Sequence, residues 1–312
     1  MQIQARNGGR GTWLEALGAV VGLAIVGALP ASAEVASYPS AEAAVEAFRA
    51  ALAQDDDGNG LVELFGTENR AQILGGDPAA ARRVLAGLRE DARVALQLAP
   101  RAEGGKALLI GAQAWPLPFP LVESGGSWSF DVAAGLDEIV NRRIGRNELA
   151  AIDLCRAYSE AQVEYSSADR DDDEVLEYAT RIESTPGKHD GLHWKDATAD
   201  DPSPLGDFAA AAEDYLEFRK QGEPYYGYRF RVLTAQGAGA PGGRYGYVIN
   251  GNMIAGFALV AWPVEPGNSG IMTFIVSQTG RIYQKDLGDK TLETVAAMKE
   301  YDPSGWTEVA GD

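Results

Sequence analysis

The sequence is poor in the side chains that form disulfides and most transition-metal sites. It has one cysteine, Cys155, and two histidines in 312 residues. A single cysteine excludes an internal disulfide. Cys155 follows Ile152 and Leu154 in a helical pattern, so we expect it to pack as a small hydrophobic side chain. A metal ligand or a catalytic thiol is the alternative interpretation.

Basic residues are also scarce. The chain has 27 lysines and arginines against 45 aspartates and glutamates, which gives a formal net charge of −18. Such a protein repels nucleic acid and anionic lipid headgroups, so we predict no nucleic-acid partner. Cationic partners or metal ions suit the charge better, although solubility alone would also account for it. Hydrophobic residues make up 46% of the chain, which excludes global disorder.

The sequence lacks an apolar run of the roughly 20 residues that a membrane-spanning helix needs. The run from Leu14 to Leu29 is shorter and contains Glu15. Two arginines precede this run, and the small residues Ala31-Ser32-Ala33 follow it, as in a secretory signal peptide. We therefore predict that residues 1–33 are a cleaved signal peptide, that no stable membrane span remains, and that the protein is periplasmic or secreted. An uncleaved membrane anchor is the alternative.

The first part of the mature chain combines helical and strand patterns. Apolar spacing predicts helices over 40–54, 61–65 and 77–88, with Ser40 and Asp77 as N-caps. Short strand-like runs follow at 93–98, 107–114 and 128–132, separated by glycine pairs and by the prolines at 116, 118 and 120. This order predicts a small N-terminal α+β domain over residues 38–134.

The rest of the chain predicts one long helix followed by a sheet. Residues 137–167 contain no proline, and apolar residues from Val140 to Tyr165 recur every three or four positions, so one side of this helix is expected to be buried. A further helix is predicted over 204–222, and Asp289 is expected to cap a closing helix. Strands are predicted over 228–233, 257–262, 271–276 and 281–285. We therefore expect an α+β fold whose second domain, 135–312, is a long helix packed on an antiparallel sheet.

Several long blocks of the sequence carry a family resemblance. They are WSFDVAAG (128–135), RIGRNELAAIDLCRAYSEAQVEY (143–165), STPGKHDGLHW (184–194), PYYGYRFRVLTAQG (224–237) and the run from 247 to 288. With these blocks in this order, the chain resembles a bacterial family of secreted proteins catalogued as domain of unknown function 2950. The resemblance covers nearly all of the mature chain. It implies a signal peptide and assigns neither an activity nor catalytic residues.

The region after residue 135 is also similar to the globular part of type IV pilins and pseudopilins, where a long helix precedes an antiparallel meander. In pilins the helix begins with an apolar half directly after the prepilin-peptidase site. Here it begins inside the chain with Asp137, Glu138 and Asn141, which cannot insert into a bilayer. The resemblance therefore implies a pilin-like fold without fibre assembly.

An acidic stretch after the long helix is the best candidate for a metal site. Aspartates at alternate positions can converge on one cation, and Ca²⁺ takes six to eight oxygen ligands. The stretch has Glu174 where calcium loops have glycine, and Thr180 where they have a bidentate glutamate. A solvated acidic loop is the alternative. The predicted calcium ligands are Asp169, Asp171, Asp173, the carbonyl of Val175, and Glu177.

Two further groups of polar residues are weaker candidates. Asp55, Asp57, Asn59 and Gly60 match the opening of a calcium loop, but a polar turn between helices is the simpler interpretation. His189 and His193 have the spacing of two ligands on a helix. Pro186, Gly187 and Gly191 exclude a helix there, so we do not expect a transition-metal site.

Tyrosines are dense around a glycine-rich segment, 237–243, that is expected to be a flexible hairpin tip. These aromatic rings would suit a glycan or a peptide, but packing against the edge of a sheet is the favoured interpretation. The tyrosines are Tyr225, Tyr226, Tyr228, Tyr245 and Tyr247.

Two functions remain open from the sequence. The favoured one is a non-catalytic exported envelope protein that binds or scaffolds an envelope protein or a glycan, with calcium as a possible ordering ion. The alternative is a periplasmic hydrolase with its pocket in the N-terminal domain. That domain offers titratable candidates, but nothing in their spacing selects them: Glu63, Glu68, Arg82 and Arg83.

Overall fold

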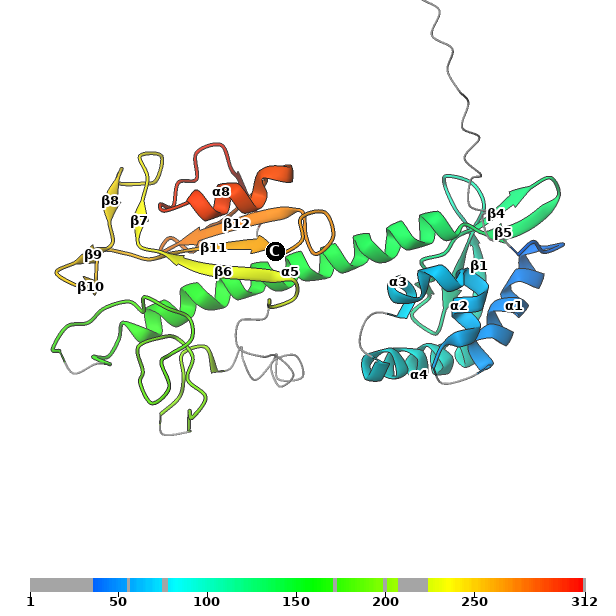
Figure 1. The fold of residues 1–312 in the computed structure, drawn as a ribbon, viewed down its shortest axis with the longest axis horizontal. Coiled ribbons are helices and arrows are strands. Elements are labelled where there is room, and N and C mark those ends of the chain that lie inside the picture. Colours follow the sequence, from blue (N-terminus) through cyan, green and yellow to red (C-terminus); the bar gives the residue numbers. More distant parts are fainter. Residues whose placement is uncertain are drawn as a thin grey trace, which may run out of the picture.

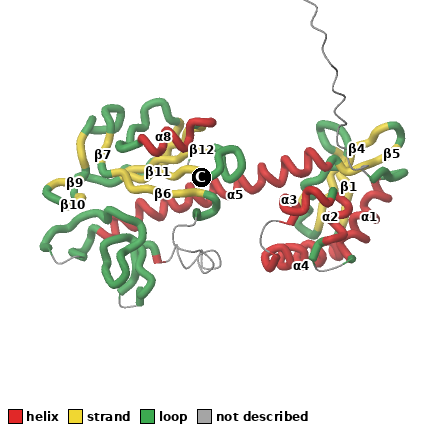
Figure 2. Tube along the Cα trace, viewed as in Figure 1, coloured by secondary structure: helices red, strands yellow, loops and turns green. Residues whose placement is uncertain are grey.

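Two lobes lie at opposite ends of one long helix, α5 (Val132–Tyr165), in the computed structural model (Figure 1). The structure describes residues 36–54, 57–74, 78–170, 173–198, 201–206 and 224–310. Each lobe has its own cluster of buried hydrophobic residues. Helices and antiparallel strands are both present in quantity, so the predicted α+β class is confirmed (Figure 2).

The N-terminal lobe places short helices against an antiparallel sheet of order β1-β2-β4-β5, with β3 pairing beside β2. Its helices are α1 (Ala41–Ala53), α2 (Asn59–Phe65), the 3₁₀ turn η1 (Thr67–Asn69), α3 (Arg70–Leu74) and α4 (Pro78–Val94). Its strands are β1 (Leu96–Pro100), β2 (Lys106–Ile110), β3 (Trp115–Pro116), β4 (Leu121–Ser124) and β5 (Ser127–Phe130). Ser40 caps α1 as predicted, because its Oγ accepts a hydrogen bond from the Ala43 amide at 3.1 Å.

Some predicted boundaries in this lobe are wrong. Helix α4 continues to Val94, so the strand predicted from residue 93 begins only at Leu96. Helix α3 and strand β4 were not predicted. Asp77, the predicted cap of α4, lies outside the described residues.

Helix α5 begins five residues before its predicted start at residue 137. Asp131 is the N-cap, and its Oδ1 accepts a hydrogen bond from the Ala134 amide at 3.0 Å. The first turn brings Gly135 against the ring of Phe119, which stacks on Phe65 with 3.8 Å between ring centroids. The 34 residues of α5, at 1.5 Å per residue, make a rod about 50 Å long.

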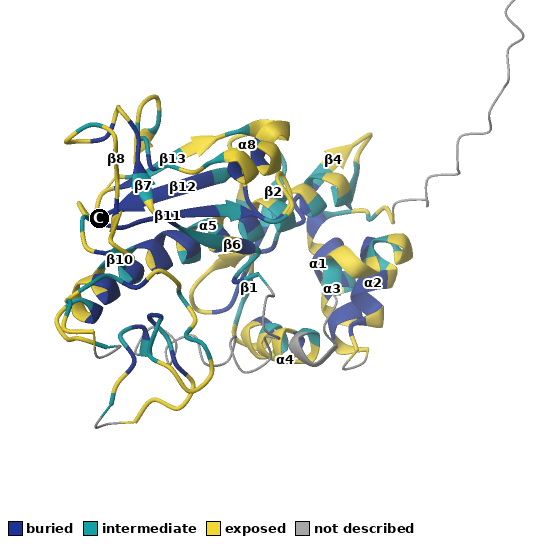
Figure 3. Cartoon of the chain, turned by 60° about the vertical axis from the view of Figure 1, so that its left-hand side comes forward, coloured by how far each residue is buried: buried dark blue, intermediate teal, exposed yellow. Residues whose placement is uncertain are grey.

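The C-terminal lobe is built on an antiparallel sheet of order β14-β13-β12-β11-β6. Its strands are β6 (Tyr228–Leu233), β11 (Ala258–Pro263), β12 (Met272–Ser277), β13 (Ile282–Asp286) and β14 (Thr307–Glu308). Helix α5 packs along the sheet, and the closing helix α8 (Thr291–Ala297) contacts β11. Strands β11 and β12 are almost fully buried, as Figure 3 shows. The internal strand predicted over 257–262 is thereby confirmed.

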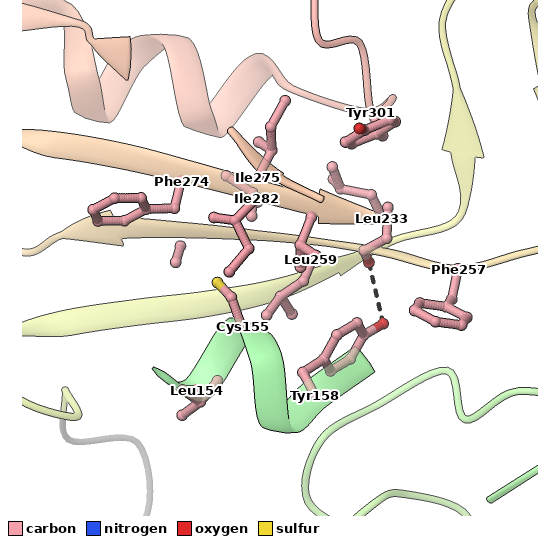
Figure 4. Packing of buried hydrophobic residues seen from close by; sticks show 14 of the residues in the cluster. Leu154, Cys155, Tyr158, Leu233, Phe257, Leu259, Phe274, Ile275, Ile282 and Tyr301 are labelled. Carbon is pink, nitrogen blue, oxygen red and sulfur yellow. Dashed lines mark hydrogen bonds between the residues drawn. The ribbon is translucent and has the colours of Figure 1, made fainter. Parts of the chain in front are cut away.

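The predicted buried stripe of α5 is also confirmed. From Ile144 to Tyr165 its residues at steps of three and four are buried, and Cys155 is a free, fully buried thiol among them. Figure 4 shows Cys155 pointing at the aliphatic side chains of the sheet. The Tyr158 hydroxyl donates a hydrogen bond to the Ala258 carbonyl at 3.2 Å, which joins the helix to β11.

The middle of α5 is clamped by the loop that joins β11 to β12. The Asn147 side chain donates to the Ser269 carbonyl at 2.9 Å, and the Glu148 carboxylate accepts from the amides of Ile271 and Met272 at 2.8 and 2.9 Å. Arg143 donates to Asn268. Because the polar groups of both partners are satisfied, this contact fixes the helix along the sheet.

Two small hairpins extend from the main sheet. One pairs β7 (Ala235–Gln236) with β8 (Tyr245–Gly246), and the other pairs β9 (Val248–Ile249) with β10 (Asn252–Met253). The glycine-rich segment between β7 and β8 is held rather than free, because the Gln236 side chain donates to the carbonyls of Pro241 and Gly243, each at 2.7 Å.

Asp289 is not the cap of α8, because the 3₁₀ turn η2 (Gly288–Lys290) precedes the helix and Lys290 takes the N-cap position. The helix predicted over 204–222 lies almost wholly outside the described residues. In the part of the chain that the structure describes, no helix is both long enough and apolar enough to cross a membrane.

Candidate functional site

The irregular chain between α5 and β6 contains a loop in which two short backbone segments run parallel. Hydrogen bonds join the Leu192 amide to the Arg181 carbonyl, the His193 amide to the Ile182 carbonyl and the Ser184 amide to the His193 carbonyl. Gly191 makes this approach possible, because a Cβ there would lie 2.8 Å from backbone atoms of the opposite segment. Substitution at this position would therefore push the two segments apart.

The carboxylate of Asp190 holds the turn between these segments. It accepts hydrogen bonds from the amide and hydroxyl of Thr185 at 2.7 and 2.8 Å, and it lies 3.5 Å from the Arg181 guanidinium. Partial burial alone would raise the pKa of Asp190. The hydrogen bonds from Thr185 and the positive charges of Arg181 and Lys188 outweigh that effect and lower the pKa below its ordinary value. The carboxylate is therefore ionised across the physiological range.

This loop forms an open pocket of about 350 Å³. That volume is at the lower end of the range for small-molecule sites. Acidic, basic, hydroxyl and imidazole groups all reach the pocket, so it suits a small polar ligand. The lining residues are Glu183, Ser184, Thr185, Pro186, Gly187, His193, Trp194, Lys195 and Asp196.

His193 is the half-buried titratable group of this pocket. Burial lowers its pKa, Glu183 opposes that effect by favouring the charged form, and Lys195 lowers the pKa further. The imidazole is therefore neutral near pH 7 and can both donate and accept a hydrogen bond. The Ser184 hydroxyl, which also lines the pocket, is buried and has no hydrogen-bond partner among the described residues.

The second histidine belongs to the wall rather than to the pocket. His189 stacks on the Trp194 indole with 4.3 Å between ring centroids, and its Nε2 lies 3.3 Å from the Asp201 carboxylate. Arg170 lies over the same indole. Trp194 is thus covered by two side chains and is only 3% exposed, so its ring is not an open stacking platform for a ligand.

The acidic stretch predicted to bind calcium closes onto the β9–β10 hairpin. Asp169 accepts from the Glu174 amide, and Asp173 accepts from the Val175 amide and from the Asn252 side chain, each at 2.8 Å. Glu177 accepts from the Met253 amide at 2.8 Å.

Three of the predicted calcium ligands, Asp169, Asp173 and Glu177, therefore already accept hydrogen bonds from the protein. Asp171 lies outside the described residues. Within the described ranges, no three or more histidine, cysteine, aspartate or glutamate side chains gather closely enough to hold a metal ion. Calcium at Asp169, Asp171, Asp173, Val175 and Glu177 therefore stays a prediction.

The other polar candidates have structural partners. Asp57 pairs with Arg82 at 2.8 Å, and the Asn59 side chain accepts from Arg70 at 2.7 Å, as expected for a polar turn between helices. Asp55 lies outside the described residues.

Packing is confirmed for most of the tyrosine cluster. Tyr225, Tyr228 and Tyr247 are buried, whereas Tyr245 reaches the surface. The Tyr228 hydroxyl donates to the Met272 carbonyl at 2.8 Å, and the Tyr247 hydroxyl donates to the Gln236 side chain at 3.1 Å. Burial, with a smaller contribution from nearby ionisable side chains, raises the pKa of both phenols, so they remain protonated.

A second concave site lies where the N-terminal lobe meets α5. It has a volume of about 270 Å³ and is lined by prolines of the β3–β4 connection together with Arg101, Glu138 and Arg142. Arg142 donates to Glu138 at 2.7 Å and to the Pro116 carbonyl at 2.8 Å, and it lies over the Trp115 ring. The titratable candidates from the sequence are not among its lining residues: Glu63, Glu68, Arg82 and Arg83.

The block 184–194 stands out in the sequence for its family resemblance, but the pocket in it was not predicted. The parallel pairing that forms the pocket has no periodic sequence signal, and Asp190 is unremarkable until Thr185 is placed beside it. The glycine at 191, in a polar segment, was the one available indication of a close backbone approach.

Comparison with known proteins gives a family and no function. No curated protein matches the chain. No solved structure matches it either, so the likeness to pilins stays a prediction. A family profile described as "Protein of unknown function (DUF2950)" matches residues 35–309, which is most of the chain. The protein therefore belongs to the DUF2950 family.

Proposed function

We propose that this protein is a non-catalytic component of the cell envelope that binds or scaffolds another envelope molecule. The observation that carries the proposal is the arrangement of two separately cored lobes on one continuous helix. Helix α5 enters both cores, and its middle is clamped by the 264–271 loop. Such a rod holds two surfaces at a fixed separation, which is what a scaffold requires.

The C-terminal lobe supplies the ligand-facing features in this proposal. The pocket at 183–196 combines carboxylates, hydroxyls, a neutral imidazole and an ammonium group, and this mixture suits a glycan or a short peptide. In this proposal the C-terminal lobe resembles pilins only in its fold, a long helix on an antiparallel sheet. Calcium bound at the acidic stretch would tighten the contact between that stretch and the β9–β10 hairpin.

Export rests on the predicted signal peptide, residues 1–33. Mass spectrometry of the native protein should find Glu34 at the N-terminus in an envelope or extracellular fraction. Recovery of the chain with Met1 attached in the cytosol would refute export.

The binding function is tested by capture from the cognate envelope extract. The mature protein, residues 34–312, is immobilised with and without a chelator, and the retained molecules are identified. His193→Ala, whose side chain lines the pocket, is the test variant, and Leu292→Ser, on the exposed face of α8, is the matched control. A partner retained by the wild type and the control but not by the test variant supports binding at the pocket. A partner retained equally by all three would move the binding site elsewhere, and no enrichment in any of them would refute the proposal.

The rival proposal, a periplasmic hydrolase, has one structural feature in its favour. The groove lined by Arg101, Glu138 and Arg142 is a concave site with charged side chains between the N-terminal lobe and α5. If that groove were catalytic, the mature protein would hydrolyse envelope-derived substrates, and Glu138→Gln would abolish turnover while leaving the fold intact. Turnover with this dependence would replace the binding proposal.

A further inference from the structure

The β9–β10 hairpin lies at the end of the C-terminal lobe distant from the N-terminal lobe (Figure 1). Exposed apolar residues of this hairpin and of the segment bonded to it form what we call the hairpin patch: Leu176, Ile249 and Ile254. These residues are between 43% and 58% exposed. Single exposed hydrophobic residues are common on proteins, but several from neighbouring segments usually mark an interaction site.

The backbone beneath the hairpin patch is well defined. Asn250 and Gly251 form the two-residue turn between β9 and β10, both with positive φ, at 54° and 104°. This is the combination that a type I′ hairpin turn requires. The turn therefore fixes how Ile249 is presented to solvent.

The segment that carries Leu176 is tied to the hairpin by three hydrogen bonds. The Asn252 side chain donates to Asp173, the Met253 amide donates to Glu177, and the Tyr178 amide donates to the Met253 carbonyl, all at 2.8 Å. Met253 itself is fully buried, so the hairpin is anchored in the core beneath it. The exposed apolar residues thus sit on a preformed surface, which lowers the entropic cost of binding.

The two segments that carry the hairpin patch have charge of one sign. Segments 173–178 and 245–254 contain three carboxylates, Asp173, Glu174 and Glu177, and no lysine or arginine. A second copy of the chain would bring like charges face to face, and a surface of anionic lipid would be repelled in the same way. An apolar partner with basic residues at its edges matches both the patch and its rim.

We infer that the hairpin patch is a docking surface for a polypeptide segment that alternates apolar and basic residues. Apolar side chains of the partner cover Ile249, Ile254 and their neighbours, and its ammonium or guanidinium groups face the carboxylate of Glu174, which is not one of the predicted calcium ligands. The hairpin patch is separate from the pocket at 183–196, so this assignment adds a second contact surface to the binding function proposed above and rests on that function.

The test uses the mature protein and three fluorescently labelled synthetic peptides of equal length. One alternates leucine and lysine, one alternates leucine and glutamate, and one alternates serine and lysine. Fluorescence anisotropy should show binding of the leucine–lysine peptide alone, with affinity that falls as salt is raised. Ile249→Ser should weaken that binding at least tenfold without changing the charge, and Glu174→Lys should weaken it as well. Leu292→Ser, remote from the patch, should leave it unchanged.

Several results would overturn the inference. Equal binding of the serine–lysine peptide would mean that charge alone attracts the probe, and an unchanged affinity in Ile249→Ser would place binding elsewhere. Self-association in sedimentation velocity, or binding to phosphatidylcholine vesicles, that is lost in Ile249→Ser would assign the patch to a second copy or to lipid. If the peptide fails but the partner captured from extract is retained by Ile249→Ser, the binding function stands and only the hairpin patch is refuted.

Discussion

Two glycines of the same helix should respond in opposite ways to the same substitution. In α5, a Cβ added at Gly135 would lie 2.0 Å from the Phe119 ring, whereas a Cβ added at Gly145 would meet nothing within 4 Å. Neither glycine has a positive φ. Gly135→Ala and Gly145→Ala therefore share the same chemistry and differ only in the space available.

The expected magnitudes follow from that difference. At Gly145, alanine favours the helix over the unfolded chain by about 0.5–1 kcal/mol, so stability should rise by that amount. At Gly135 the same gain is opposed by overpacking, which costs about 1–3 kcal/mol and sometimes more. Phe119 cannot move away easily, because it is 3% exposed and stacked on Phe65. The net effect should be a loss of about 1–2 kcal/mol.

Urea unfolding followed by far-ultraviolet circular dichroism measures both changes. The midpoint should move up for Gly145→Ala and down for Gly135→Ala, with the slope of the transition unchanged. Wild-type or greater stability for Gly135→Ala would show that the first turn of α5 does not pack on Phe119. A loss of stability in Gly145→Ala would show that this part of the helix contacts more than the structure places there.

Four further outcomes are expected. Gln236→Leu removes the donor to the carbonyls of the glycine-rich loop and should destabilise the loop by about 1–3 kcal/mol. Proteolysis at residues 237–244 should therefore be faster than in the wild type, and an unchanged cleavage rate would show that Gln236 does not hold the loop. Gly191→Ala should cost about 1–3 kcal/mol through the clash with the opposite backbone, and unfolding midpoints equal to wild type would refute it. Burial lowers the pKa of His193 below its ordinary value of 6.5, so at lower pH the folded state binds fewer protons than the unfolded state. The free energy of unfolding should therefore fall as the pH drops through 6.5, and it should fall less in His193→Gln. Parallel pH profiles of stability for the wild type and the variant would refute the assignment. Millimolar Ca²⁺ should raise the melting temperature and protect residues 168–178 from proteolysis, and no shift would remove calcium from the proposal.

The sequence predicted those parts of the fold that carry a strong period. The buried stripe of α5 and the strand β6 were both located correctly. The strict alternation expected in β6 is not observed, because Leu233 is buried although it lies on the opposite face from Tyr228. The start of α5 was missed because Val132 continues a strand-like run and Gly135 resembles a turn, while the contact with Phe119 that favours the helix is far away in sequence. Tertiary packing overrides local propensity at such positions.

The candidate site was harder to predict for a related physical reason. Its pocket depends on hydrogen bonds between irregular segments, such as the Ser184 amide to the His193 carbonyl, and irregular pairing leaves no pattern in the residues. The acidic stretch was visible from its composition. Its contact with the β9–β10 hairpin, through Asn252 and Met253, was not.

Because both lobes pack on α5, this helix also sets their relative orientation about its axis. Arg142 donates a hydrogen bond to the Pro116 carbonyl in one lobe, and the next residue, Arg143, donates to Asn268 in the other. The contacts of α5 therefore change from one lobe to the other between two consecutive residues. One residue inserted between them would turn one lobe by about 100° about the axis of α5, whereas seven would return it to within about 20° of its original azimuth while lengthening the rod. Insertions of different length therefore separate the spacing of the lobes from their relative orientation, and can show which of the two a bound partner senses.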